Sequence, residues 1–102
     1  MKSAVLERLG KLVVKEVPDP QVGPDDALVK VHACAVCGSD VRIYHHGNSR
    51  VRPPAILGHE SSGEIVAVGE RVKGFRPGDR VALGSDVPCG ECAACKAGYG
   101  NN

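Results

Sequence analysis

Residues 58–69 read Gly-His-Glu-Ser-Ser-Gly-Glu-Ile-Val-Ala-Val-Gly. The apolar residues of this stretch predict a strand at 60–68. Gly63, inside the strand, predicts either a β-bulge or a place where another backbone comes close. His59 and Glu60 stand where the strand begins, at its junction with a loop. The stretch therefore predicts a strand with two polar side chains held rigidly at its start.

The segments on either side extend this pattern to a mainly β fold. Residues 27–35 alternate in polarity with the period of two that a half-buried strand shows. Gly10 lies between two short apolar runs and predicts the turn of a β-hairpin. Further strands are predicted at 4–8, 12–17 and 80–83, one short helix at 38–46, and loops at 18–24 and 50–54. The order of these elements predicts a mostly antiparallel, partly open β-barrel with one short helix, in a single domain of residues 1–102.

The sequence carries no signature of a dinucleotide-binding fold. A Rossmann domain would show Gly-x-Gly-x-x-Gly directly after a strand, within a βαβ unit. Gly58 and Gly63 lack the other glycines and that context. We therefore expect no Rossmann domain in these 102 residues.

The composition narrows the class of function. The 13 Lys and Arg residues are scattered and nearly balance the 12 Asp and Glu residues, so neither nucleic acid nor a membrane is an expected partner. No apolar run approaches the roughly 20 residues needed to cross a bilayer, and the amino terminus does not resemble a secretory signal. These observations predict a cytoplasmic protein. Three of the five cysteines lie close together, which favours a metal site over disulfides.

Cys89, Cys92 and Cys95 form a C-x2-C-x2-C pattern with mostly small residues between the thiols. This spacing lets three thiolates converge on one zinc ion, which prefers four tetrahedral ligands in structural sites. A bacterial ferredoxin pattern would also need a fourth cysteine nearby and a following proline. Three free, buried thiols are the alternative. The sequence predicts a zinc site with three of its four ligands present.

A second candidate site is divided between two strand ends. Cys37 follows the strand at 27–35, and His59 and Glu60 open the strand at 60–68. A thiolate, an imidazole and a carboxylate make the mixed set of a catalytic zinc, which keeps one position open for water or substrate. Taken singly, such residues are more often a core cysteine, a surface histidine and a solvated glutamate.

Cys34 forms another C-x2-C pair with Cys37, for which a redox role is an alternative. No thioredoxin-like βαβ pattern surrounds the pair. Cys34 also lies within the alternating strand, so we expect its side chain to pack in the core.

Four motifs stand in order along the chain: Cys37-Gly38-Ser39-Asp40, residues 58–69, Pro77-Gly78-Asp79-Arg80-Val81, and the loop with Cys89, Cys92 and Cys95. Their order and spacing resemble the amino-terminal GroES-like domain of zinc-dependent medium-chain alcohol and polyol dehydrogenases, close to the sorbitol and threonine dehydrogenase branch. The resemblance covers essentially the whole chain. It implies a GroES-like, partly open β-barrel and a zinc-dependent NAD(P) oxidoreductase that oxidises a secondary alcohol or polyol to a ketone.

The resemblance also implies roles for single residues. It assigns to a catalytic zinc Cys37, His59 and, as a direct or exchanging ligand, Glu60, and to a structural zinc Cys89, Cys92 and Cys95. Asp40 would orient His59 from outside the ligand set, and Ser39 would accept the proton of the alcohol. Zinc would stabilise the alkoxide by lowering the pKa of the bound alcohol, and hydride would pass to the nicotinamide of NAD or NADP.

One residue departs from the family pattern. Many relatives carry a histidine five positions after the first ligand cysteine, where this chain has Arg42. Arginine does not release its proton near neutral pH, so a relay from Ser39 would end at water, at His45 or at His46. His45 and His46 also fit a polar helix end, which is the interpretation that we favour.

The resemblance sets an expectation for the extent of the chain. In the family the fourth structural cysteine comes eight positions after the third, one residue beyond Asn102, and a dinucleotide-binding domain follows. We therefore expect part of an enzyme, truncated within the structural-zinc loop at about 89–102 and inactive by itself. Full-length relatives are usually homodimers or homotetramers that act on small alcohols. A non-catalytic zinc-binding or partner-binding GroES-like module is the alternative.

Overall fold

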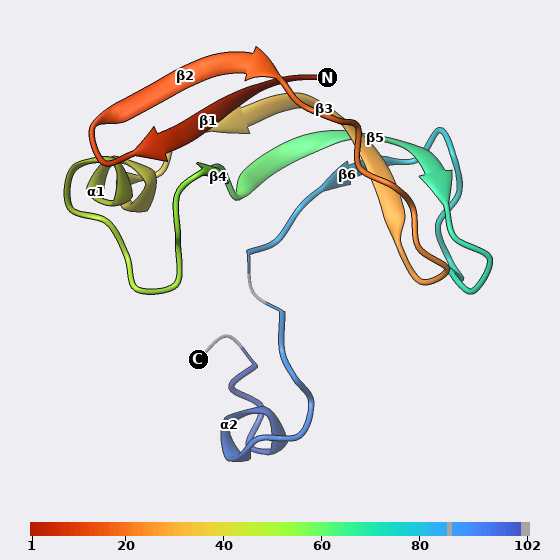
Figure 1. Ribbon diagram of the computed structural model, residues 1–102. Helices are drawn as coiled ribbons and strands as arrows, with labels where there is room; N and C mark the ends of the chain where they lie inside the picture. Colours follow the sequence, from red (N-terminus) through yellow and green to blue (C-terminus); the bar gives the residue numbers. More distant parts are fainter. Residues whose placement is uncertain (86, 101–102) are drawn as a thin grey trace.

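The structure, a computed structural model, describes residues 1–85 and 87–100. Its elements are β1 (Lys2–Arg8), β2 (Lys11–Glu16), β3 (Ala27–Ala35), α1 (Gly38–His46), β4 (Ala55–Ile56), β5 (Glu60–Val68), β6 (Arg80–Ala82) and α2 (Ala93–Lys96). The strands form two three-stranded sheets, in the orders β2-β1-β4 and β3-β5-β6 (Figure 1). The pairs are antiparallel, which confirms the predicted mainly β fold. No pairing in the described residues joins the two sheets, so the barrel is open.

β1 and β2 form the predicted hairpin. Gly10 occupies its turn with a φ of 70°, a left-handed backbone conformation that glycine adopts without steric cost. The turn is tied to α1, because the Gly10 N–H donates to the Tyr44 carbonyl at 2.8 Å and the Tyr44 hydroxyl donates to the Gly10 carbonyl at 2.7 Å. These two hydrogen bonds hold the hairpin against the helix.

β3 and β5 are the long strands of the second sheet, and both have the bounds predicted from the sequence. Their antiparallel ladder begins where Ala27 faces Val68 and ends where Ala35 faces Glu60. The end of β3 and the start of β5 therefore lie at the same edge of the sheet. Residues just after β3 and just before β5 come together there, although they are far apart in the sequence.

Gly63 lies where β3 and β5 approach closely. A Cβ atom on Gly63 would lie closer than 3.0 Å to the carbonyl oxygen of Lys30, a distance that Cβ atoms essentially never show. The register of the two strands also shifts between Val31, which faces Gly63, and Ala33. Both expectations for this glycine, a close backbone and a bulge, are confirmed.

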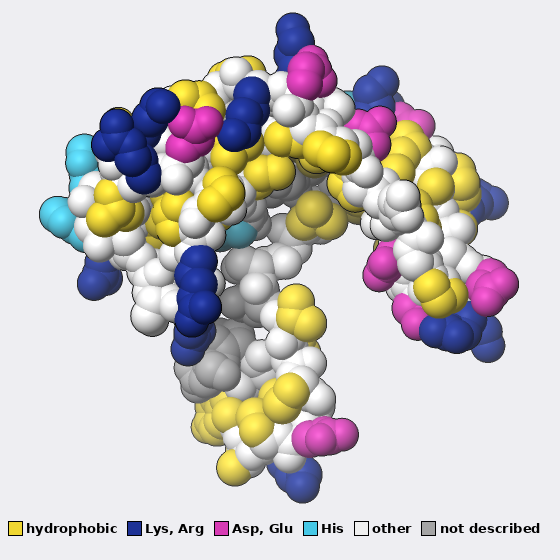
Figure 2. Space-filling view, in the orientation of Figure 1, with side chains coloured by type: hydrophobic (Ala, Val, Ile, Leu, Met, Phe, Trp, Pro, Cys, Tyr) yellow, Lys and Arg dark blue, Asp and Glu magenta, His cyan; other side chains and the backbone are white. Residues whose placement is uncertain are grey.

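The buried core is small. Val5 and Leu6 of β1 and Ile65 of β5 are the buried apolar side chains of the described residues, and apolar side chains reach the surface in several places (Figure 2). β3 was expected to be half-buried, but only Leu28 and Val29 are partly covered and its other residues are exposed. That expectation is wrong because alternation makes a strand amphipathic, whereas burial also requires a second layer packed on its apolar face.

Two short elements lie outside the sequence prediction. β4 consists of Ala55 and Ile56, which pair with Leu6 and Val5 of β1. α2 is a single turn within the cysteine loop and lies apart from both sheets (Figure 1). The expectation of one helix is therefore wrong, because a turn of four residues has no apolar periodicity that would reveal it. No helix in the described part of the chain is long and apolar enough to span a membrane.

Candidate metal centres

The first centre, defined as Cys37, His59 and Glu60, forms at the shared edge of β3 and β5. Cys37 is the N-cap of α1, with φ −83° and ψ 154°. The Cys37 N–H donates to Oδ2 of Asp40 at 3.0 Å, which is one half of a capping box. The cap fixes where α1 begins relative to the end of β3. It thereby places the Cys37 thiol beside the first residues of β5.

The three potential ligand atoms of the first centre lie within 4.8 Å of one another. They are one thiol sulfur, one imidazole nitrogen and one carboxylate oxygen. Cys37 and His59 are half-buried and Glu60 is exposed. The fold therefore brings together the residues that the sequence proposed as the catalytic ligand set, with one side open to solvent.

His59 is contacted through both ring nitrogens. Its Nδ1 lies 3.5 Å from Oδ1 of Asp40, and its Nε2 lies 3.4 Å from Oγ of Ser39. Asp40 thus contacts the His59 ring with one oxygen and caps the helix with the other. A carboxylate in contact with a ring nitrogen can set the orientation and tautomer of an imidazole.

In the first centre, the Cys37 thiol and the His59 imidazole each shift the pKa of the other. Hydrogen bonds from the Ser39 side chain and backbone, and then from His59, hold the pKa of the Cys37 thiol below its usual value. The hydrogen bond with Cys37, and then the charges of Asp40, Cys37 and Glu60, raise the pKa of His59 against the effect of burial. The site therefore favours a thiolate at Cys37, which is the form of cysteine that binds metals.

The other candidates for the proton relay lie away from this centre. These candidates, His45 and His46, are exposed in the last turn of α1. At 1.5 Å per residue, Ser39 and His45 are separated by about 9 Å along the helix axis. The rings of His45 and of Tyr44 pack edge to face with centroids 4.8 Å apart. The two histidines thus occupy a polar helix end.

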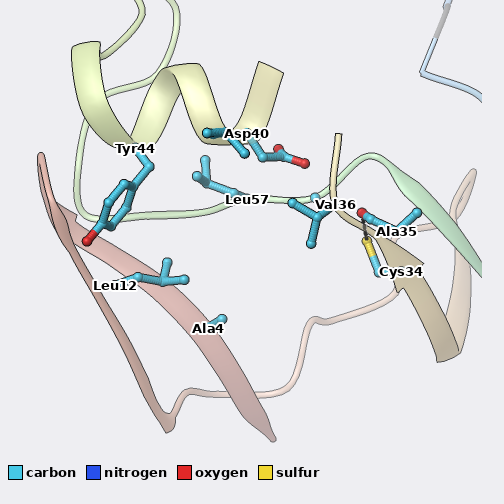
Figure 3. Close-up of a pocket in the computed structure, with 10 residues that line it drawn as sticks. Ala4, Leu12, Cys34, Ala35, Val36, Asp40, Tyr44 and Leu57 are labelled. Atoms are coloured by element: carbon cyan, nitrogen blue, oxygen red, sulfur yellow. Dashed lines mark hydrogen bonds between the residues drawn. The ribbon is translucent and has the colours of Figure 1, made fainter. Parts of the chain in front are cut away.

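Cys34 does not pack in the core, contrary to expectation. Its side chain is exposed and accepts a hydrogen bond from the Ser61 hydroxyl at 3.2 Å. It lines an apolar cavity of about 280 Å³ between the hairpin, α1 and the end of β3, together with Ala4, Leu12, Ala35, Val36, Asp40, Val41, Tyr44, Leu57 and Gly58 (Figure 3). Sequence patterns did not reveal this cavity because its walls come from segments that lie far apart in the sequence. The space next to Cys34 is open instead of filled by a facing layer.

The second centre is defined as Cys89, Cys92 and Cys95, whose Sγ atoms lie within 4.8 Å of one another. The Cys92 N–H points at Sγ of Cys89 at 3.4 Å, and the Cys95 N–H points at Sγ of Cys92 at 3.5 Å. Cys92 is thereby the N-cap of α2. Cys89 and Cys92 are exposed and Cys95 is half-buried. The alternative of three buried thiols is therefore wrong.

The thiol separations of the second centre fit a tetrahedral ion. Zinc–sulfur distances near ~2.3 Å place two sulfurs of a tetrahedron about 3.8 Å apart. Sγ of Cys89 and Sγ of Cys95 are separated by 3.9 Å. The loop thus holds these two thiols at the spacing that a shared zinc ion would require.

The Cys89 thiol is expected to titrate near neutral pH in the metal-free chain. The backbone N–H groups of Glu91 and Cys92 face its sulfur, and together with the Cys92 and Cys95 side chains they lower the pKa from 9.0 to about 7. Lowering the pKa stabilises the thiolate, so Cys89 should be mainly thiolate above pH 7 when folded and only above about 9 when unfolded. Iodoacetamide modification, followed by peptide mass spectrometry over pH 5 to 10, would give the midpoint. The same series in urea is the control, and equal midpoints would contradict the prediction.

Comparison with known proteins places this architecture in a family. Residues 23–102 match the family model described as alcohol dehydrogenase GroES-like domain. The chain is 45% identical over 104 residues to sorbitol dehydrogenase of Bacillus subtilis (strain 168), covering 99% of this chain and 30% of that protein. It is 43% identical over 90 residues to L-threonine 3-dehydrogenase of Caldanaerobacter subterraneus subsp. tengcongensis, covering 85% of this chain and 25% of that protein. The chain thus spans less than a third of these relatives.

A solved structure shows the same fold. Alcohol dehydrogenase TADH from Thermus sp. ATN1 superposes with a TM-score of 0.85 at 40% identity, over 99% of this chain and 29% of that one. The matched family model covers most of the 102 residues. The chain therefore belongs to the family of alcohol dehydrogenase GroES-like domains.

Proposed function

We propose that this chain is the amino-terminal part of the catalytic domain of a zinc-dependent NAD(P) oxidoreductase that oxidises a secondary alcohol or polyol to a ketone. The observation that carries the proposal is the first centre, where Cys37, His59 and Glu60 present three ligand atoms within 4.8 Å. The relatives named sorbitol dehydrogenase and L-threonine 3-dehydrogenase support the substrate class.

The donor set of the first centre fits zinc. Sulfur, nitrogen and oxygen ligands from cysteine, histidine and glutamate are all ones that zinc accepts, and three protein ligands leave a position for substrate. When bound there, zinc would act as a Lewis acid toward the oxygen of an alcohol. Cys37 and His59 would hold the ion from the half-buried side, and Glu60 from the exposed side.

The surrounding residues supply positioning and proton transfer. Asp40 would keep the His59 ring in place through Nδ1, which leaves Nε2 as the nitrogen for the ion. Ser39, 3.4 Å from that nitrogen, would accept the proton of the substrate hydroxyl at Oγ. Because Ser39 is exposed and Arg42 cannot accept a proton, the relay would end at water.

The second centre would serve stability. All of its potential ligands are cysteines, and zinc sites made only of thiolates are structural because they leave no position for substrate. Cys89, Cys92 and Cys95 would bind the ion, with a fourth ligand from outside the described residues. A bound ion would stabilise this exposed loop in place of side-chain packing.

The nicotinamide cofactor would be bound by another part of the polypeptide. The strand pairs of the described residues are antiparallel, whereas a dinucleotide fold needs parallel strands joined by helices. A protein of Sinorhizobium meliloti 1021 that matches this chain at 41% identity, with a TM-score of 0.85 over 28% of its own length, was solved bound to NADP. NAD or NADP would accept the hydride from the carbinol carbon.

The metal content of the chain tests this proposal. Elemental analysis of the purified 102-residue chain after zinc loading should give two ions per chain. Cobalt substitution should give two absorption signatures, because one centre offers three sulfurs and the other a single sulfur with nitrogen and oxygen. With zinc, NAD(P) and secondary alcohols the chain alone should show no turnover.

The competing function is a zinc-binding GroES-like module without catalysis. It predicts one ion per chain, held by the second centre alone. A count of one, with the cobalt spectrum of an all-sulfur site, would therefore favour the module and contradict the dehydrogenase proposal. Appreciable turnover by the isolated chain would contradict the assignment of the nicotinamide site to another part of the polypeptide.

A further inference from the structure

The three cysteines of the second centre are free thiols, which can be oxidised as well as bind a metal. Cys89 and Cys92 are exposed, Cys95 is half-buried, and none of the three forms a disulfide. We propose that Cys89 and Cys95 are an oxidation site, which low-molecular-weight disulfides convert to an intramolecular disulfide with release of the bound ion. The disulfide step rests on the loop geometry alone, whereas the ion release also rests on the proposed zinc role.

The geometry of this pair is close to what a disulfide needs. Sγ of Cys89 and Sγ of Cys95 are 3.9 Å apart, and the bond length is about 2.05 Å. Closing the gap requires a movement of about 2 Å. Gly90, Ala93 and Ala94 between the two thiols are small, and Gly90, next to Cys89, has a φ of 77°, a backbone conformation that glycine adopts without steric cost. The described residues between β6 and α2, Cys89 among them, are in neither strand nor helix, so Cys89 can move toward Cys95 of α2 without breaking a ladder.

Cys92 is the less favourable partner. Its sulfur accepts the N–H of Cys95 as the N-cap of α2, and a disulfide from Cys92 would remove that cap. A bond between Cys89 and Cys95 leaves the Cys92 sulfur free to keep it. The Cys34 sulfur makes hydrogen bonds with the Ser61 hydroxyl and the Ala35 carbonyl. The structure thus favours one pair of cysteines for oxidation.

The reaction proceeds by two thiol–disulfide exchanges. The Cys89 thiolate attacks one sulfur of the disulfide R–S–S–R, forming a mixed disulfide and expelling one R–S⁻. The Cys95 thiolate then attacks the Cys89 sulfur and expels the second R–S⁻. Two protein thiolates are oxidised and one R–S–S–R is reduced to two thiolates. A zinc ion held there would keep its charge and would lose two of the three described residues that would hold it, Cys89 and Cys95.

Oxidation of the metal-free 102-residue chain by oxidised glutathione tests the choice of pair. Free thiols are blocked with iodoacetamide, the chain is reduced, and released thiols are labelled with N-ethylmaleimide. Tandem mass spectrometry then locates both labels. We expect maleimide on Cys89 and Cys95 and carbamidomethyl on Cys92. Maleimide on Cys92, or the mixed glutathione disulfide as the final product, would overturn the proposal.

Two matched variants sharpen this test. Cys92→Ser keeps the proposed pair, so the intramolecular disulfide should form as in the parent chain. Cys89→Ser should lose it completely. Formation of a loop disulfide in Cys89→Ser, or its loss in Cys92→Ser, would overturn the assignment. Both variants are compared with Cys34→Ser, which should behave as the parent does.

Ion release is measured separately on the zinc-loaded chain. A chromogenic zinc chelator should report one ion released per chain on addition of oxidised glutathione, and dithiothreitol should restore zinc binding. Zinc that stays bound while the metal-free chain forms the disulfide would overturn the release step. A chain that never binds zinc at the second centre would contradict its proposed structural role, and the label positions in the metal-free chain would still decide the oxidation site.

Discussion

Replacement of His59 by alanine is expected to lower the zinc affinity of the first centre by more than about 100-fold. Loss of a residue that only supports a ligand typically costs about 10–100-fold in metal affinity, and His59 is proposed as a ligand itself. The variant also loses the ring that lies 3.5 Å from Asp40 and 3.4 Å from Ser39. The zinc content should fall from two ions to one, and competition titration with a chelator would measure the affinity.

The matched control is His45→Ala. His45 is exposed in the last turn of α1, where its ring lies next to the rings of Tyr44 and His46. This variant should keep two ions. The converse change, Cys92→Ser, should lose the ion of the second centre and keep that of the first. Two ions bound to His59→Ala with the affinity of the parent chain would show that the first centre is not a metal site.

Replacement of Gly63 by alanine is expected to destabilise the fold by about 3 kcal/mol or more. Overpacking a filled site typically costs about 1–3 kcal/mol, and here the obstacle is backbone, since the new Cβ would meet the carbonyl oxygen and carbon of Lys30. These atoms belong to β3 and cannot rotate away as a side chain would. Because a domain is stable by only about 5–15 kcal/mol, the change should be visible in urea unfolding followed by far-UV circular dichroism.

Gly84→Ala is the control for this prediction. A Cβ atom on Gly84 would meet nothing within 4 Å, and its backbone does not require glycine. Its unfolding midpoint should stay close to that of the parent chain. Equal midpoints for Gly63→Ala and the parent would contradict the close approach of β3 and β5. Since that approach aligns Ala35 with Glu60, zinc binding by the first centre should weaken in Gly63→Ala as well.

The sequence alone predicted the long elements and the membership of both candidate sites. β3, β5 and α1 have the bounds that their residue patterns indicate, because such patterns depend on neighbouring residues alone. Cys37, His59 and Glu60 were found as residue types suited to zinc, and the loop of three cysteines by its spacing. β4 and α2 were missed because two and four residues are too short for a period to show.

Tertiary structure decided how these parts meet. Only the antiparallel ladder, which ends with Ala35 opposite Glu60, brings Cys37 within 4.8 Å of residues that lie far along the chain. Burial was also decided there: Cys34 lies in a strand with the pattern of a core element, yet it is exposed beside an open cavity. The physical reason is the same in both cases. Local sequence determines which backbone conformation and which chemistry a residue offers, whereas proximity and burial depend on which other segment packs against it.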